Sequence, residues 1–172
     1  YEMDYCDWSS DVCSSDLLLV ALMLAVQSMG LQQTVVGPLV NMFLFLGVTL
    51  VGVAGACAIG AVTPITGLWA GILAPPLAPL VPIIGVGNAS MCLLFWASSR
   101  ALRNSLAGRV LGILMGSAVK NVVLAVSVRV FIDVPPAVAA AMGSIQLINA
   151  LIGGVLALTA ARVLERTGIT RL

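Results

Sequence analysis

Apolar residues fill most of the chain in long runs, separated by short stretches rich in glycine, proline or polar residues. The runs cover residues 17–29, 37–51, 53–72, 83–98, 106–131 and 137–164. A helix of about 20 apolar residues spans the hydrocarbon core of a bilayer. The pattern therefore predicts an all-α integral membrane protein, with six transmembrane helices packed in one bundle.

Prolines mark the expected starts, bends and breaks of these helices. Pro38 stands near the start of the second run, and proline suits a first helical turn because its missing N–H would have no partner there. Pro64 lies inside the third run, where it should kink the helix or end it early. Segment 73–82 is rich in proline but apolar. We expect it to form a stiff loop that lies at the membrane surface or folds back into the protein.

Residues 1–16 differ from the rest of the chain because they are acidic and polar, with Ser-Ser-Asp at 9–11 and again at 14–16. They resemble a translated sequencing adaptor, which would be an artefact; the alternative is an acidic tail disordered in water. We expect one transmembrane domain over 17–172. The run 17–29 would reach only about 20 Å of a roughly 30 Å core, so the native first helix is expected to begin upstream.

Charge is scarce and unevenly placed. The chain is 60% hydrophobic and 9% charged, whereas soluble domains carry about 25% charged residues. All the basic residues lie at Arg100 or later, mainly within 100–109 and 162–171. The positive-inside rule places both clusters, and with them the N-terminus, in the cytoplasm. Bases spread over loops and ends do not suit a nucleic-acid surface, so the expected surroundings are the lipid bilayer.

Several classes of chemistry are not expected. The chain has no histidine and no glycine-rich phosphate loop, HExxH, GxSxG or CxxC pattern. Cys57 and Cys92 stand alone in apolar runs, where cysteine is usually a small packing residue. We expect no catalytic residues, no metal site and no cofactor, and hence no enzyme.

A few polar residues fall inside the apolar runs, and they are the candidate substrate-binding residues: Asn41, Asn88, Lys120, Asn121, Gln146 and Asn149. The amides could simply bond helix to helix. Lys120 stands out, because a charge at membrane depth costs about 2.5–3.5 kcal/mol and usually marks function. No acid lies in any predicted span to neutralise it. Lys120 could hold an anionic group of a ligand, or it could snorkel or bind backbone carbonyls.

Small residues recur at the four-residue spacing that lets helices approach closely in lipid. Gly108, Gly112 and Gly116 form one series, Gly67 and Gly71 a pair, and Ala21 and Ala25 another. For the glycines we favour packing within this chain.

Three elements carry a resemblance to a known family: Gly-Pro-Leu-Val-Asn at 37–41, Thr63-Pro64, and Ala-Pro-Pro-Leu-Ala-Pro at 74–79. With the runs 110–126 and 145–164, they make nearly everything after residue 16 resemble the substrate-binding S components of energy-coupling factor (ECF) transporters. It looks most like members whose substrate is uncharacterised.

The resemblance implies a six-helix subunit of a prokaryotic plasma membrane that captures a vitamin or other micronutrient from outside. It also implies a transmembrane coupling subunit and two cytoplasmic ATPase subunits as partners. Family members dock through an Ala-x-x-x-Ala motif on the first helix, matched here by Ala21 and Ala25. Two alternatives stay open: a small secondary transporter or channel-like protein, and a membrane assembly protein without a ligand.

Overall fold

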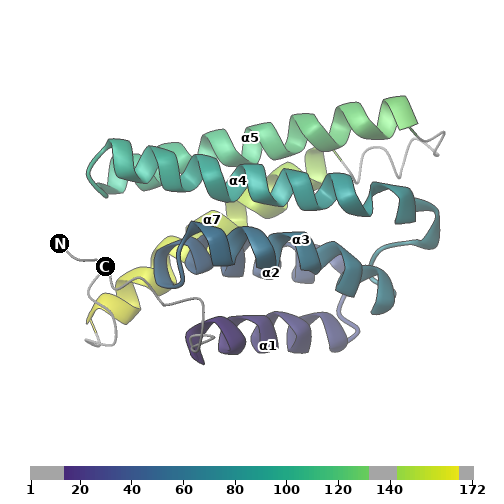
Figure 1. Ribbon diagram of the computed structural model, residues 1–172, viewed down its shortest axis with the longest axis horizontal. Helices are drawn as coiled ribbons and strands as arrows, with labels where there is room; N and C mark the ends of the chain where they lie inside the picture. The colour runs from purple at the N-terminus through teal and green to yellow at the C-terminus, as the bar shows by residue number, and fades with distance from the viewer. Residues whose placement is uncertain (1–13, 132–142, 167–172) are drawn as a thin grey trace.

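The computed structural model describes residues 14–131 and 143–166, and every regular element in these ranges is helical (Figure 1). The all-α prediction is confirmed. The elements are α1 (Ser14–Ser28), α2 (Gln33–Leu50), α3 (Val53–Trp69), the 3-10 helix η1 (Pro75–Leu80), α4 (Val81–Ala101), α5 (Leu106–Phe131) and α7 (Ser144–Arg166). Residues 1–13, most of the segment interpreted as an adaptor or tail, lie outside the described residues.

Within the described residues, four helical stretches are long and apolar enough to cross a bilayer: Gln33–Leu50, Pro75–Ala101, Leu106–Val130 and Ser144–Arg166. Leu18–Ser28 and Val53–Trp69 are apolar but shorter. The chain is therefore a helical, multi-pass membrane protein.

The structure corrects the expected place of Pro38 and excludes an early end of the third helix at Pro64. α2 begins at Gln33, so Pro38 lies inside the helix rather than in its first turn. α3 runs past Pro64 to Trp69 instead of ending there, for a reason that lies in the site described below. The proline-rich segment forms η1, which leads directly into α4, and its buried Leu77 and Leu80 pack against Val128 of α5. The segment thus folds back onto the protein.

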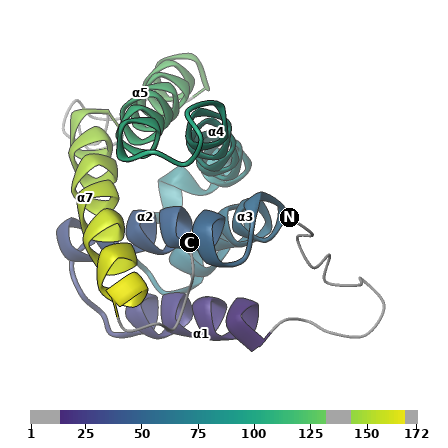
Figure 2. The same cartoon turned by 90° about the vertical axis from the view of Figure 1, so that its left-hand side faces the viewer.

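The helices run in alternating directions along the long axis of the molecule (Figure 1). Viewed from one end, α1 lies below α2 and α3, α4 and α5 lie above them, and α7 crosses one side (Figure 2). The main core joins α2 to its neighbours: the rings of Phe45 on α2 and Phe95 on α4 meet edge to face with centroids 5.0 Å apart.

Glycines let α5 lie directly on the backbone of α4. A Cβ atom added at Gly112 would lie 2.8 Å from Phe95 Cα, and one at Gly116 would lie 2.9 Å from the Met91 carbonyl oxygen. Gly108 faces Ser98 and Leu102 in the same way. This series packs within the chain, as predicted.

The other two small-residue pairs do not pack within the described residues. Gly71 lies beyond the end of α3 with φ +73°, and a Cβ at Gly67 would meet no atom within 4 Å, so the predicted glycine pair is wrong. Ala21 and Ala25 are both exposed on α1.

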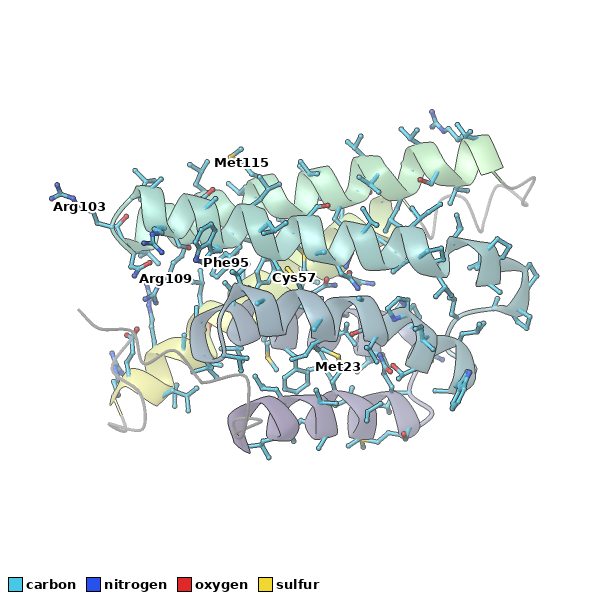
Figure 3. All side chains as sticks on the ribbon, in the orientation of Figure 1. Met23, Cys57, Phe95, Arg103, Arg109 and Met115 are labelled. Atoms are coloured by element: carbon cyan, nitrogen blue, oxygen red, sulfur yellow. The ribbon has the colours of Figure 1, made fainter. Side chains whose placement is uncertain are left out.

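Arginines gather at one end of the bundle, where α4 turns into α5 and α7 ends. Arg103 and Arg109 both lie there (Figure 3). Arg109 donates to Glu165 of α7 over 3.3 Å.

Candidate functional site

A cavity of about 70 Å³ opens at the end of the bundle opposite these arginines. Its walls come from the last turns of α1 and α3 and the first turns of α2, α4 and α7, with Lys120 entering from α5. Its polar wall residues are Gln27, Gln33, Asn41, Thr63, Asn88, Lys120 and Gln146. The rest of the wall is apolar, apart from glycine and proline backbone.

Lys120 is the only basic residue in the cavity wall, and it is only 4% exposed. Its Nζ donates to Asn41 Oδ1 over 2.6 Å, and Asn41 Nδ2 donates to the Gly37 carbonyl over 2.8 Å. Asn41 is thereby held with its oxygen toward the ammonium. An ammonium has three N–H donors, and no carboxylate among the described residues pairs with Lys120. Among the described residues, no acidic side chain compensates the positive charge that Lys120 brings to the cavity.

Pro64 explains the position of Asn88. Proline has no N–H, so it cannot bond to the carbonyl four residues earlier in its helix, which here belongs to Gly60. Asn88 Nδ2 of α4 donates to that Gly60 carbonyl over 2.9 Å. The bond satisfies the carbonyl and lets α3 continue through Pro64 without leaving a buried group unpaired.

This bond also fixes the other end of the Asn88 amide. Because the carbonyl can only accept, the atom facing it must be the nitrogen, and the oxygen is turned away. Asn88 is 2% exposed, and its Oδ1 has no hydrogen-bond partner among the described residues. Asn88 is one of the residues that line the cavity, so an amide whose oxygen lacks a donor belongs to the cavity wall.

Of the six residues that the sequence suggested, Asn41, Asn88, Lys120 and Gln146 line this one cavity. Asn149 does not line it; it is buried on α7 behind Gly37, and its Nδ2 has no partner among the described residues. Asn121 also lies outside the wall, because it points from a different side of α5 than its neighbour Lys120.

Sequence reasoning missed Gln27, which is buried at the end of α1. Gln27 Nε2 donates to the Thr63 carbonyl over 3.4 Å, and Thr66 Oγ1 donates to Gln27 Oε1. The available signal was a glutamine in the last turn of an otherwise apolar run. Gln33, in the first turn of α2, also lies in the cavity wall.

The wall consists of groups that can bind a small molecule. It offers one cation, several amides and an apolar remainder, and no histidine or acid of the described residues contributes to it. No cluster of three or more potential metal-ligating His, Cys, Asp or Glu residues occurs in the described ranges. Comparison of the chain with protein-family models, curated proteins and solved structures gives no match.

Because Asn88 supplies the donor that Pro64 lacks, substitutions at these two residues should have non-additive effects on the free energy of unfolding. Asn88→Leu should lower the free energy of unfolding by about 1–3 kcal/mol, because the Gly60 carbonyl loses its donor. In Pro64→Ala the new N–H can bond to Gly60, so the same Asn88→Leu change should cost at least about 1 kcal/mol less. Unfolding in mixed detergent micelles measures both. Ser90→Ala is the control, since it removes a bond within α4 only. Equal costs in the two backgrounds would refute the assignment.

Proposed function

We propose that this chain is the substrate-binding subunit of an ATP-driven micronutrient uptake transporter, an S component of the energy-coupling factor type. One observation carries the proposal: a cavity lined by a buried lysine, which has no carboxylate partner among the described residues, opens at the end of the bundle opposite Arg103 and Arg109. A membrane protein gains nothing from burying an unbalanced charge unless something binds it. The proposed substrate is a small molecule with an anionic group that Lys120 holds, while Asn88 and Gln146 contact its polar parts.

The proposed topology has six spans with the arginine end in the cytoplasm. Helices that alternate in direction bring the N-terminal end of α1 and the C-terminal end of α7 to this side (Figure 1). The cavity then faces the exterior, where a nutrient would be captured. Its depth fits this role: Lys120 lies about 21 Å along α5 from Leu106, at 1.5 Å per residue, and so beyond the midplane of a roughly 30 Å core.

The proposed partners supply the energy and the docking surface. The sequence holds no phosphate-binding loop, so we propose that two ATPase subunits drive transport through a transmembrane coupling subunit. Ala21 and Ala25 are the proposed contact, because both are exposed and small side chains permit close approach of helices in lipid.

Deleting the charge of Lys120 tests the binding site. Lys120→Met keeps the bulk of the stem, so the fold should persist. Affinity for the small molecule that co-purifies with the wild-type chain, identified by native mass spectrometry, should fall by one to two orders of magnitude. That loss corresponds to about 1.5–3 kcal/mol for a charge-assisted hydrogen bond.

Ser127→Ala is the matched control for Lys120→Met. Ser127 is buried on the same helix but lies outside the cavity, bonded to its own backbone. Undiminished affinity in Lys120→Met, with folding confirmed, would assign the lysine a structural role instead.

The topology predicts opposite accessibility at the two ends. In a chain whose native cysteines are replaced by alanine, Ala74→Cys should react with an impermeant maleimide added to intact cells. Arg103→Cys should react only after the cells are opened. Both positions are at least partly exposed in the structure, so burial does not prevent labelling. Labelling of position 103 from outside would exclude this orientation.

If Ala21 and Ala25 contact the coupling subunit, changing them should prevent assembly with that subunit without affecting binding of the small molecule. Changing Ala21 and Ala25 together to Leu should abolish co-purification with the coupling subunit, because the larger side chains hold the helices apart. The co-purifying small molecule should remain bound. Ala97→Leu with Ala118→Leu, at exposed alanines on α4 and α5, serves as the control. Assembly that survives the α1 changes would disprove this contact.

A further inference from the structure

Helix packing does not explain why the side-chain oxygen of Asn88 is buried without a hydrogen-bond donor among the described residues. A buried carbonyl oxygen without a donor is costly, because it has lost its bonds to water. Asn88 Oδ1 is in this state among the described residues, while the nitrogen of the same amide is bonded to Gly60. Helix-to-helix bonding therefore accounts for only half of the amide.

The surrounding backbone prevents the oxygen from moving to another partner. A Cβ atom added at Gly60 would lie 3.0 Å from Asn88 Cβ, and one at Gly85 would lie 3.4 Å from Ala61 Cα. α3 and α4 are thus in close contact on both sides of the Gly60 bond. Rotating the amide would also place two acceptor oxygens face to face, because Pro64 leaves the Gly60 carbonyl without a donor from its own helix.

Two donors in the cavity wall have other partners, and the remaining N–H groups of Lys120 are left for the anionic group of the ligand. Lys120 Nζ bonds to Asn41 Oδ1, and Gln27 Nε2 bonds to the Thr63 carbonyl. The cavity therefore presents two fixed and complementary features: the cation of Lys120 and the acceptor of Asn88, both in its wall.

We infer that the substrate carries, besides its anionic group, a neutral N–H or O–H donor that binds Asn88 Oδ1. This inference rests on the proposed function and narrows it to a chemical class: hydroxy acids, acids with an amide N–H, or ring N–H acids. A plain carboxylate would leave the acceptor unpaired, and a cation would meet Lys120 without any wall carboxylate to hold it. A site built around a donor strongly rejects the analogue that lacks it.

Matched probes test the inference on the purified chain in detergent, with the shift in thermal unfolding as the measure of binding. The probes are 2-, 3- and 4-hydroxybutyrate, butyrate, and the three hydroxybutyramides. At least one hydroxybutyrate should bind roughly tenfold or more tightly than butyrate. Its amide, which lacks the charge, should bind more weakly by a similar factor.

A double variant isolates the acceptor from its structural role. When Pro64→Ala is combined with Asn88→Leu, the backbone N–H gained at position 64 satisfies Gly60, so the fold should persist without the amide. The preference for the hydroxy acid should fall to less than about twofold, with butyrate binding unchanged; Pro64→Ala alone should keep the preference.

The outcomes separate the two proposals. Butyrate that binds the wild-type chain as tightly as every hydroxybutyrate would overturn the inference and leave the proposed function standing. A preference that survives in the double variant would also overturn it. Failure of every hydroxybutyrate to bind would overturn the inference, whereas the proposed function fails if no small molecule co-purifies with the wild-type chain in native mass spectrometry.

Discussion

Hydrocarbon offers no hydrogen bonds, so each polar group carried into this bundle must find its partner within the chain or in something the chain binds. Most of the architecture around the cavity follows from this constraint. Pro64 leaves a carbonyl unpaired inside α3, and the side chain of Asn88 on α4 pairs it. Lys120 brings an ammonium to the same depth, and Asn41 accepts one of its hydrogens. Of the unpaired buried atoms in the described residues, only Asn88 Oδ1 belongs to a residue of the cavity wall, and it is therefore the best indicator of a ligand there.

Close helix packing makes this arrangement rigid enough to select a ligand. A Cβ atom at Gly153 of α7 would lie 2.6 Å from the Pro38 carbonyl oxygen and 2.7 Å from Asn41 Cβ, so α7 holds the helix that positions Lys120. Gly60 and the α5 glycines bring α3 and α5 equally close to α4. In lipid, where burial of apolar surface gives little drive for association, such contacts are what keep helices together. The same glycines therefore stabilise the bundle and fix the cavity walls.

The sequence predicted the helical class and the approximate place of each helix, because apolar runs of this length have few alternatives in a membrane. It also predicted Lys120, since a lone charge in such a run is conspicuous. It could not separate Asn88 from Asn121, because both look like isolated amides until the facing helix is known. Nor could it show that Asn88 pairs with Gly60, a partner 28 residues away that depends on the register of α3 against α4. Gln27 was missed because its partners, Thr63 and Thr66, lie on a helix that only the fold brings beside α1.

Gln27 lines the cavity and lies on the same helix as the proposed docking residues Ala21 and Ala25. Its amide lines the cavity and is bonded to α3, while Ala21 and Ala25 are exposed on the same helix. α1 is otherwise held mainly by a few apolar side chains, including Leu19 and Met23. A ligand that takes up the hydrogen bonds of Gln27 would therefore act on one of the few polar anchors of the helix that carries the docking residues. If the coupling subunit binds Ala21 and Ala25, the same linkage must work in reverse, because any effect of ligand on docking implies an equal effect of docking on ligand affinity. The proposed transporter would need that reciprocity, since its substrate would have to bind tightly outside and be released once the proposed ATPase subunits act.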